Sequence, residues 1–566
     1  MKVVIVGGVA GGASAAARIR RLDETAQIVV FERSGYISYA NCGLPYYIGG
    51  VITEQAELTL QTPGSFWNRF RVEMRVHHEV TAIYADRKCV AVRNLKTGEV
   101  FEESYDKLVL SAGARPTQPA LPGIGLEKLF TLRTVEDTLR IREFVERNQP
   151  KSAVLAGGGF IGMELAENLR ELGMDVTIVQ RPKQLLNLLD ADMASFVHAK
   201  MREKGVNLKL GYTVEGFEED AGGVKVLLKD SESLCADMVV LAIGVTPDTR
   251  LAKDAGLELG IKGSIVVNDR METSVPDIYA VGDAVQVKNF VTGEDAVIPL
   301  AGPANKQGRI AADNICGGDS HYRGSQGSAV VKVFDMTAAT TGINERAAKA
   351  AGIDCDKICL APMSHASYYP GGKQMTIKVV FEKETYKLLG AQIVGYEGVD
   401  KRIDVLATAI RAGLSGLQLP DLDLAYAPPY SSAKDPVNMA GFMIENIAAG
   451  KVKQFHWEAL DTLPRDGSVT LLDTRTVPEY KAGHVDGFIN LPLDELRERL
   501  AELDVSKPVY VHCQSGLRSY LACRILAQYG YDCYNISGGY RLYESMMLDR
   551  CVAEAGYPCG MEKSKA

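Results

Sequence analysis

The sequence lacks several features that would assign it to other classes of protein. None of its apolar runs is long enough to cross a bilayer, and no low-complexity tract interrupts its 566 residues. The net charge of −8 is spread along the chain, without the basic patch that nucleic-acid binding requires. We therefore expect small-molecule partners, and neither a nucleic acid nor a membrane.

Cysteine is present, but not in the spacing of a disulfide framework or a zinc site. The eleven cysteines are scattered, and no C-x-x-C pair occurs. We therefore expect no metal, and the thiols remain available for chemistry. The chain opens directly on the strand pattern "KVVIV", without a charged leader, which favours a cytoplasmic location. Its length suggests about four domains.

A glycine-rich turn near the start predicts a nucleotide-binding unit. Residues 2–6 have the pattern of a buried parallel strand, and "GGVAGG" follows before a helical segment. Gly7 permits a tight turn, Gly12 lets helix and strand pack closely, and the helix N-terminus offers N–H groups to a pyrophosphate. The expected cofactor-binding turn consists of Gly7, Gly8, Val9, Ala10, Gly11 and Gly12.

The strand that follows, "QIVVFE", supports this interpretation. It ends in Glu32, where a carboxylate can accept hydrogen bonds from both hydroxyls of an adenosine ribose, and Arg33 comes next. One departure from the G-x-G-x-x-G pattern is Val9, which replaces the middle glycine. Close approach of the backbone to phosphate would then depend on Gly8 or Gly11.

A second glycine turn lies within residues 153–179, again between a strand and a helix. The residue that ends the second strand is Gln180, and Arg181 follows it. A carboxylate there would repel a 2′-phosphate, whereas glutamine and arginine would not, so both NADH and NADPH remain open. The turn contains Gly157, Gly159, Phe160, Ile161 and Gly162, in complete G-x-G-x-x-G spacing.

Three further strings each have the pattern of a strand that runs into a glycine turn. They are "YDKLVLSAGARP" (105–116), "ADMVVLAIGVTPDTRL" (236–251) and "TSVPDIYAVGDA" (273–284). In the last of them Asp283 follows a strand, where a carboxylate can hold a ribityl hydroxyl. Together with the two glycine turns, these strings resemble the pyridine nucleotide-disulfide oxidoreductases, whose FAD domain is split in sequence by an NAD(P)H domain.

This resemblance implies an α/β fold with two Rossmann-like nucleotide-binding domains and an α+β dimerisation domain, and therefore a homodimer. It places the FAD-binding domain at 1–118 and 246–325, the NAD(P)H-binding domain at 119–245 and the dimerisation domain at 326–445. The helix along the flavin ring is expected at 299–315. Further cofactor contacts implied by the resemblance are Asn41, Ala112, Gly113, Gly244, Gly282, Pro299 and Ala301.

The stretch "SYANCGLPYYIGG" contains a cysteine that must act singly. Most disulfide reductases of this family carry a C-x-x-x-x-C pair, but the next cysteine after Cys42 is Cys89. The stretch resembles the single-cysteine branch, which contains coenzyme A-disulfide reductases and NADH oxidases or peroxidases. Cys42 would form a mixed disulfide with a substrate thiol, or a sulfenic acid. A nearby helix N-terminus is expected to raise its thiolate fraction.

Weaker signals point to coenzyme A as the substrate or carrier. Arg18, Arg20 and Arg21 lie on the first helix, where the resemblance implies contacts to coenzyme A phosphates; a solvated helix face is the alternative. By the same resemblance, Ser38 and Asn41 flank the pantetheine arm. Four tyrosines match stretches that this branch brings across the dimer interface toward the cysteine, and each can also be interface packing. Tyr368 and Tyr426 are the first choices, and Tyr369 and Tyr430 compete with them.

A fresh α/β pattern begins near residue 459, after an expected linker at 446–458. "SVTLLDTRTVPEYKAGHVDGFINLP" and "KPVYVHCQSGLRSYLACRIL" together resemble a rhodanese domain at 459–566. Its six-residue loop surrounds one sulfur with backbone N–H groups at a helix N-terminus, and it is shorter than the phosphatase loop. We interpret Asp473, Arg475 and His484 as structural supports. The loop consists of Cys513, Gln514, Ser515, Gly516, Leu517 and Arg518.

The whole chain resembles fusions of coenzyme A-disulfide reductase with rhodanese, which include NADH-dependent persulfide reductases. We hypothesise that Cys42 attacks coenzyme A persulfide, or a polysulfide, and that Cys513 handles sulfane sulfur. The expected cofactors are FAD, NADH or NADPH, and coenzyme A. Three alternatives remain: reduction of coenzyme A disulfide, NADH oxidation by oxygen, and a flavin-bound redox sensor. Both a persulfide and a disulfide present a sulfur–sulfur bond to the same thiolate, so the sequence does not rank them.

Overall fold

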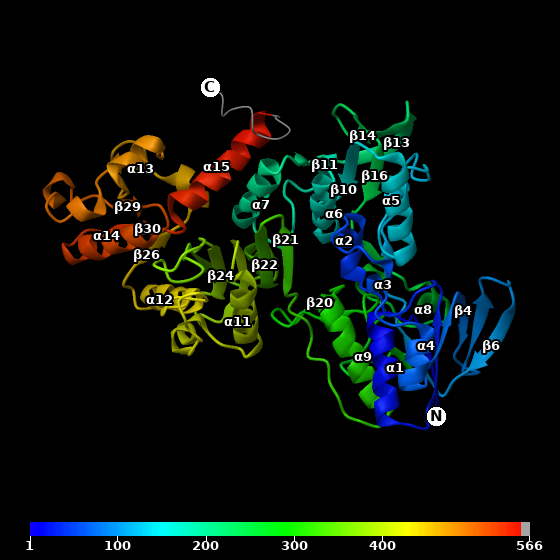
Figure 1. The fold of residues 1–566 in the computed structure, drawn as a ribbon. Helices are drawn as coiled ribbons and strands as arrows, with labels where there is room; N and C mark the ends of the chain where they lie inside the picture. Colours follow the sequence, from blue (N-terminus) through cyan, green and yellow to red (C-terminus); the bar gives the residue numbers. More distant parts are fainter. Residues whose placement is uncertain (556–566) are drawn as a thin grey trace. The chain divides into compact units, whose positions relative to one another are not determined.

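The computed structural model describes residues 1–555 (Figure 1). The described chain divides into two compact units. The first contains residues 1–183 and 205–327, and the second contains residues 184–204 and 328 onward. The chain therefore passes from one unit to the other three times.

The first unit is built around two parallel five-stranded sheets. One has the order β18-β7-β1-β2-β3 and the other the order β12-β11-β10-β16-β9. Their central strands, β1 (Lys2–Val6) and β10 (Ser152–Ala156), are almost fully buried, as their continuous runs of valine, isoleucine, leucine and alanine predict. The other strands of these sheets are β2 (Gln27–Glu32), β3 (Glu73–Val76), β7 (Lys107–Leu110), β18 (Ile278–Ala280), β9 (Leu129–Thr131), β11 (Asp175–Gln180), β12 (Asn207–Leu210) and β16 (Met238–Leu241).

The two glycine turns repeat one geometry. Gly7 and Gly157 have φ of +98° and +119°, and a Cβ on either would lie 2.2 Å from a backbone oxygen, so only glycine fits. Val9, which replaces the expected middle glycine, caps helix α1 (Ala10–Leu22) with φ of −102°. A side chain is allowed at this φ, which explains why the departure from the pattern leaves the turn intact. Gly159 caps α6 (Phe160–Glu171) in the same way.

Helix α9 (Ala301–Ile315) packs against α1 along its length (Figure 1). The crossing is close, because a Cβ on Gly308 would lie 2.3 Å from the backbone oxygen of Gly11. The remaining helices of the unit are η1 (Asn41–Gly43), α2 (Leu44–Ile48), α3 (Gln55–Leu58), α4 (Pro63–Phe70), α5 (Val135–Asn148), α8 (Arg250–Asp254) and η2 (Ile261–Gly263). The remaining strands are β4 (His78–Tyr84), β5 (Cys89–Asn94), β6 (Val100–Ser104), β8 (Ala114–Pro116), β13 (Val214–Asp220), β14 (Gly223–Leu228), β15 (Leu234–Ala236), β17 (Val245–Pro247), β19 (Val287–Lys288) and β20 (Asp295–Ala296).

The second unit contains an antiparallel sheet and a parallel sheet. The antiparallel sheet has the order β21-β22-β25-β24-β23, and helices flank it. Its strands are β21 (Ala329–Val333), β22 (Met336–Gly342), β23 (Cys355–Leu360), β24 (Thr376–Glu382) and β25 (Leu388–Gly395). Its helices are α10 (Glu345–Ala350), α11 (Val399–Arg411), η3 (Gly416–Asp421) and α12 (Pro436–Ala448).

The parallel sheet of this unit has the order β26-β30-β29-β27-β28. Its edge strand β26 (Lys453–Phe455) lies inside the segment 446–458 that the sequence suggested as a linker, and it pairs with β30 (Cys533–Ile536). Residues 453–455 are therefore part of the sheet, and only the four residues 449–452 separate this strand from the end of α12. The other elements are β27 (Thr470–Asp473), β28 (Ile489–Asn490), β29 (Val509–His512), η4 (Trp457–Thr462), α13 (Val477–Ala482), η5 (Leu493–Glu495), η6 (Leu500–Glu502), α14 (Leu517–Gln528) and α15 (Gly539–Ala555).

One helix of the second unit comes from far away in the sequence. Helix α7 (Ala191–Glu203) follows strand β11 of the first unit, but it packs against α15 (Figure 1) and also contacts strand β25. Helix α7 is buried on several sides, and its buried side chains include polar ones such as His198. Nδ1 of His198 lies 2.9 Å from an oxygen of Asp549 on α15, and its Nε2 accepts the N–H of Leu185.

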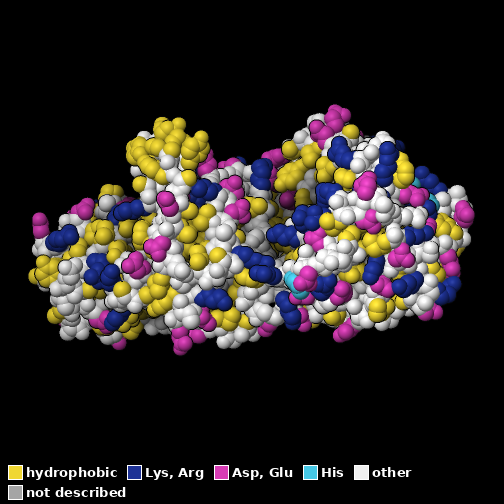
Figure 2. Space-filling model, turned by 90° about the horizontal axis from the view of Figure 1, so that it is seen from below, with side chains coloured by type: hydrophobic (Ala, Val, Ile, Leu, Met, Phe, Trp, Pro, Cys, Tyr) yellow, Lys and Arg dark blue, Asp and Glu magenta, His cyan; other side chains and the backbone are white. Residues whose placement is uncertain are grey.

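Within the described residues, no helix is both long and apolar enough to cross a membrane. The molecular face in Figure 2 carries basic and acidic side chains interspersed, as the sequence distribution of charge predicts.

Candidate functional sites

Cys42 lies in the short helix η1, which runs directly into α2. The residue is exposed, but the chain packed around its sulfur raises the pKa of the thiol, first by desolvation and then through the charge of Glu164. Arg133 lowers this pKa, and Asp283 raises it. Burial, and after it the negative charge of Glu164, thus oppose formation of the thiolate, and the expected effect of a helix N-terminus stays a prediction.

Arg133 connects the groups around Cys42. Its guanidinium lies 2.6 Å from the carboxylate of Asp283. The side-chain amide of Asn41 fits Arg133 when its nitrogen donates to the backbone oxygen, at 3.0 Å. Asp283, which the sequence suggested for a ribityl hydroxyl, is therefore held beside Asn41 by an arginine that sequence reasoning did not select.

Tyr46 and Glu164 form a second group beside Cys42. The hydroxyl of Tyr46 donates to Oε1 of Glu164 over 3.5 Å. Burial raises the pKa of Glu164 to about 7, the hydrogen bond from Tyr46 opposes this shift, and the neighbouring Glu167 adds to it. Sequence reasoning missed Glu164, although it lies on α6 only two residues after Gly162, the last glycine of the second turn.

The ends of the second strands hold the two glycine turns in the same way. A carboxylate oxygen of Glu32 accepts the N–H of Gly8 at 2.9 Å. At the second glycine turn, Oε1 of Gln180 accepts the N–H of Gly158 at 3.0 Å. Glu32 thus accepts a hydrogen bond from the glycine turn in addition to any contact with a ribose. Gln180 accepts the equivalent hydrogen bond at the second turn without a negative charge.

The other predicted cofactor residues gather at the carboxyl ends of parallel strands, where ligands bind in open α/β sheets. Ala112 and Gly113 follow β7, Gly282 and Asp283 follow β18, and Gly244 follows β16. Pro299 precedes helix α9, which begins at Ala301.

Two further predicted residues, Arg33 and Ser38, have partners within the first unit. Arg33 is paired with Asp248 at 2.9 Å. Ser38 adopts φ of +44° and donates its N–H to the backbone oxygen of Gly8.

The three arginines of helix α1 have different environments. Arg20 is buried and donates to five backbone oxygens, including those of Phe70 and Ala26, so its role is structural. Arg18 is paired with Asp313 on α9 at 2.6 Å. Arg21 is exposed near the end of the helix. Arg18 and Arg21 therefore remain the candidates for a phosphate contact.

The four predicted tyrosines are all exposed on the second unit. The hydroxyls of Tyr368 and Tyr426 lie 2.7 Å apart, so the structure brings the two first choices together. This hydrogen bond raises the pKa of Tyr426. Tyr369 instead packs edge-on against the His365 ring, and Tyr430 is 72% exposed.

Cys513 lies at the base of the six-residue loop, between strand β29 and helix α14. The N–H of Gly516 donates to its Sγ at 3.1 Å, and the hydroxyl of Ser519 approaches the same sulfur at 3.4 Å. Gly516 has φ of +96°, in the left-handed region that favours glycine. The sulfur is thus surrounded by donors that stabilise an anion. Cys523 and Cys533 are buried, as expected of core residues.

The loop is held from both sides. Arg518 forms two hydrogen bonds with Glu479, at 2.7 and 2.8 Å, and this pairing lowers the pKa of Glu479 to about 2. Arg475 is buried with Asp473, so these two residues act as supports, as the sequence suggested. His484 is exposed and stacks on the ring of Tyr480.

The start of helix α15 and the residues just before it connect the Cys513 loop to the antiparallel sheet. Tyr540 and Arg541 donate their N–H groups to the oxygens of Cys513 and Gln514. Arg541 also contacts the side chain of Gln374 at 3.1 Å. Just before this helix, the hydroxyl of Ser537 accepts the N–H of Cys359 on strand β23. The sulfur-binding loop is therefore positioned by both sheets of the second unit.

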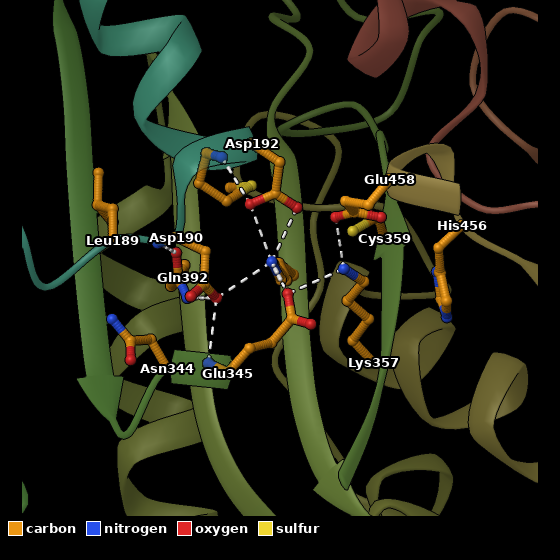
Figure 3. A network of polar contacts seen from close by, with 12 residues as sticks. Leu189, Asp190, Asp192, Asn344, Glu345, Lys357, Cys359, Gln392, His456 and Glu458 are labelled. Carbon is orange, nitrogen blue, oxygen red and sulfur yellow. Dashed lines mark hydrogen bonds and ion pairs between the residues drawn. The ribbon is translucent and has the colours of Figure 1, made fainter. Parts of the chain in front are cut away.

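A buried charge network joins the same two sheets to α7 (Figure 3). The ammonium of Lys378 is fully buried, contacts both oxygens of Asp192 at 2.8 Å, and is also paired with Asp190 and Glu345. These three carboxylates come close enough to hold a cation, and Lys378 supplies the positive charge. Lys357 extends the network to Glu345 and, at 2.6 Å, to Glu458 of η4.

Comparison with known proteins assigns these two sites to a family. The profile of the pyridine nucleotide-disulphide oxidoreductases matches residues 1–308, and that family's dimerisation domain matches residues 328–436. A rhodanese-like domain matches residues 456–546. The chain therefore belongs to the pyridine nucleotide-disulphide oxidoreductase family and carries a C-terminal rhodanese domain, which confirms the predicted α/β fold class.

Particular relatives narrow the comparison. The chain is 37% identical to the coenzyme A disulfide reductase of Staphylococcus aureus (strain JH9) over 444 residues, which cover 78% of this chain and 99% of that protein. It is 49% identical to reduced Bacillus anthracis CoADR-RHD, with a TM-score of 0.95 and 97% and 98% of the two chains covered. It is 39% identical to a NAD-dependent persulfide reductase from A. fulgidus, with a TM-score of 0.90 and coverage of 96% and 100%.

Proposed function

We propose that the protein is an NAD(P)H-dependent flavoprotein that reduces coenzyme A persulfide, or a polysulfide, to sulfide and thiol. The observation that carries this proposal is a single thiol, Cys42, placed beside two nucleotide turns in a chain that also carries an intact sulfur-binding loop at Cys513. Similarity to the persulfide reductase and to the coenzyme A disulfide reductase supports the substrate class.

The residues of the first glycine turn fit the pyrophosphate of FAD. Helix α1 has no side-chain cap at its N-terminus, which leaves N–H groups for an anion. A Cβ on Gly12 would lie 1.9 Å from the oxygen of Gly7, so the turn is built from backbone packed on backbone. Glu32 would hold the ribose, and Asp283 and Ala301 would line the flavin. When bound, FAD passes two electrons from the nicotinamide to a disulfide at Cys42.

The second turn fits NAD(P)H by the same argument. Helix α6 also lacks a side-chain cap at its N-terminus. Gln180 leaves the 2′-position of the ribose without a negative charge, so the chain tolerates either nicotinamide. We propose NADH as the main donor, because the persulfide reductase relative is described as NAD-dependent.

The chemistry of the chain is centred on Cys42. Its thiolate attacks the sulfur of coenzyme A persulfide that is bonded to carbon, the sulfur–sulfur bond of the persulfide breaks, and hydrosulfide leaves. A mixed disulfide between Cys42 and coenzyme A remains until two electrons cleave it. We propose that Arg18 and Arg21 hold coenzyme A phosphates and that Ser38 and Asn41 flank the pantetheine arm.

We propose that Cys513 receives sulfane sulfur as an anionic persulfide. The N–H of Gly516 and the hydroxyl of Ser519 would stabilise its negative charge. Because Cys513 is fully buried and its loop is tied to the antiparallel sheet, we infer that the sulfur reaches Cys42 on a small carrier rather than by movement of the domain.

We further propose that the protein acts as a homodimer. The family's dimerisation domain covers the exposed tyrosines Tyr368 and Tyr426. Apolar and aromatic side chains of this kind are expected to be covered by a partner. In this arrangement the tyrosine pair of one subunit would complete the Cys42 site of the other.

An anaerobic assay tests the function. NADH consumption and sulfide release are measured with coenzyme A persulfide, coenzyme A disulfide and polysulfide, for the wild type, Cys42→Ser and Cys513→Ser. The matched control is Cys235→Ser, which changes an exposed cysteine on strand β15. We expect Cys42→Ser to abolish sulfide release and the control to leave it unchanged.

Other outcomes would favour the alternatives. Turnover of the disulfide alone would show a coenzyme A-disulfide reductase. NADH consumption that appears without any sulfur substrate when the assay is repeated in air would show an oxidase. Bound flavin with no NADH oxidation in any assay would indicate a redox sensor. Sulfide release that survives Cys42→Ser would overturn the proposed mechanism.

A further inference from the structure

The Cys42 site contains a carboxyl group, Glu164, that the mechanism above does not use. Residues 42–46 form one continuous right-handed stretch, since η1 runs into α2 and both Gly43 and Leu44 have helical backbone angles. Side chains four residues apart on such a stretch share a face. Cys42 and Tyr46 therefore lie on the same face, and the hydroxyl of Tyr46 points to Glu164.

Helices α2 and α6, which carry Tyr46 and Glu164, are in close contact. A Cβ on Gly49, the residue that ends α2, would lie 2.0 Å from the side-chain oxygen of Asn168 on α6. This close contact fixes α2 against the helix that bears Glu164. The order Cys42, Tyr46, Glu164 is thus a property of helix packing and not of flexible side chains.

The reaction proposed above consumes a proton. Reduction of a persulfide by NADH requires one proton from outside the nicotinamide, and hydrosulfide leaves as a base. We propose that Glu164 is the proton reservoir of the Cys42 site, and that it supplies the departing sulfur with a proton through the hydroxyl of Tyr46. The inference rests on the proposed function and assigns a positioning role to a residue outside the glycine turns.

The step balances in atoms and charge. The Cys42 thiolate forms a bond to the coenzyme A sulfur, and the bond to the outer sulfur breaks with its electron pair. The resulting hydrosulfide takes the proton of Tyr46, and Tyr46 takes the proton of the Glu164 carboxyl. The products are hydrogen sulfide, a mixed disulfide and the Glu164 carboxylate, which is reprotonated from water.

The electrostatic surroundings suit this role. Burial holds the pKa of Glu164 at about 7, so the carboxyl exchanges a proton near neutral pH. The groups that face it are Tyr46, whose pKa is raised to about 12, and Glu167 on the same helix. Cys42 is faced by Glu164, Arg133 and Asp283. Once Glu164 has lost its proton, its charge raises the pKa of the Cys42 thiol, so the two groups titrate together.

The test uses the holoenzyme with Glu164→Gln and Tyr46→Phe. The matched control is Glu171→Gln, which changes an exposed carboxylate on the same helix. The step requires both the Cys42 thiolate, whose pKa is raised, and the protonated Glu164 carboxyl. We therefore expect wild-type turnover with coenzyme A persulfide to rise with pH below about 7 and to level off above it. Both variants should lose this change of slope near pH 7 and be slower by about tenfold or more on its acid side. Glu171→Gln should retain the profile.

A second readout does not depend on turnover. The rate at which iodoacetamide alkylates Cys42, followed by peptide mass spectrometry, should titrate in two steps in the wild type. In Glu164→Gln it should titrate in one step at lower pH, because a negative charge that faces the thiol is gone. A pH profile and an alkylation curve unchanged by Glu164→Gln would overturn the inference. If Cys42→Ser abolishes sulfide release in the same preparation, the proposed function survives that result.

Discussion

The hydroxyl groups of Tyr368 and Tyr426 lie 2.7 Å apart on the exposed face of the dimerisation domain, although 57 residues separate them in sequence. The two tyrosines therefore act as one hydrogen-bonded pair, in which one hydroxyl donates and the other accepts. This bond raises the pKa of Tyr426 above its ordinary value of 10.

We predict that Tyr426→Phe and Tyr368→Phe each slow turnover, because the pair can then no longer donate a proton to the coenzyme A thiolate that leaves when the mixed disulfide at the partner subunit's Cys42 is cleaved. A lost general acid typically costs about 100-fold in kcat. Tyr369→Phe is the control, since that ring packs against His365 and lies outside the pair. If all three variants turned over at the wild-type rate, the tyrosine pair would have no role beyond packing at the interface.

For the rhodanese loop, we predict that Ser519→Ala slows loading of sulfur onto Cys513. The Ser519 hydroxyl approaches the sulfur at 3.4 Å, and a hydrogen bond to a charged group contributes about 1.5 kcal/mol, or roughly tenfold in rate. The measurement is persulfide formation at Cys513 from thiosulfate, by mass spectrometry. Ser506→Ala, on an exposed turn, should leave the rate unchanged. A Ser519→Ala variant that loads sulfur at the wild-type rate would exclude this role.

The choice between the two nicotinamides should depend on Gln180. Gln180→Glu keeps an oxygen that can accept the N–H of Gly158, just as Glu32 does for Gly8, so the turn is preserved. The new charge would repel a 2′-phosphate and raise KM for NADPH by about tenfold or more, with little effect on NADH. The check is steady-state KM for both donors. A parallel rise for both would show damage to the turn.

Acid stability should depend on the network around Lys378. Burial alone would raise the pKa of Glu345, but Lys378 and Lys357 outweigh it and lower this pKa to about 2. A depressed carboxyl stabilises the fold above its ordinary pKa of about 4.3, and that contribution is lost as the pH falls toward 2. We therefore predict that the free energy of unfolding decreases between these pH values, and that Glu345→Gln flattens the decrease.

Removal of Lys378 should lower the free energy of unfolding more than removal of an exposed lysine. Lys378→Met leaves three carboxylates without their shared cation and is expected to lower the free energy of unfolding by about 3–5 kcal/mol. Lys383→Met, which breaks the exposed pair with Asp354, should cost less than about 1 kcal/mol. Urea unfolding followed by circular dichroism measures both. If the two variants lost a similar free energy of unfolding, the Lys378 network would not contribute to stability more than a surface ion pair does.

The strongly local features of this fold could be predicted from the sequence. The glycine turns, the strands before them and the Cys513 loop each depend on a short string whose residues contact one another, so spacing alone is informative. Val9 was a departure from the pattern at the sequence level, and its backbone angles show that the position does not require glycine.

The features that the sequence did not reveal depend on contacts between distant segments. Glu164 has an ordinary place on an amphipathic helix, and only the packing of α2 against α6 brings it to Tyr46. Arg133 reaches Asp283 across 150 residues. Lys378 has the pattern of a strand residue, and its partners come from α7 and α10. These contacts join residues that are far apart in the sequence, so periodicity and motif spacing could not predict them.

The position of α7 affects how the protein can fold and how it can be divided. Residues 184–204 belong to the second unit, whereas the residues on both sides of them belong to the first. No single break in the chain therefore yields two complete halves. During synthesis, α7 emerges before residues 328 onward, so its buried polar side chains must remain without their final partners until the dimerisation sheet and α15 have been made. Helix α7 can therefore complete its packing in the second unit only after α15 has been synthesised.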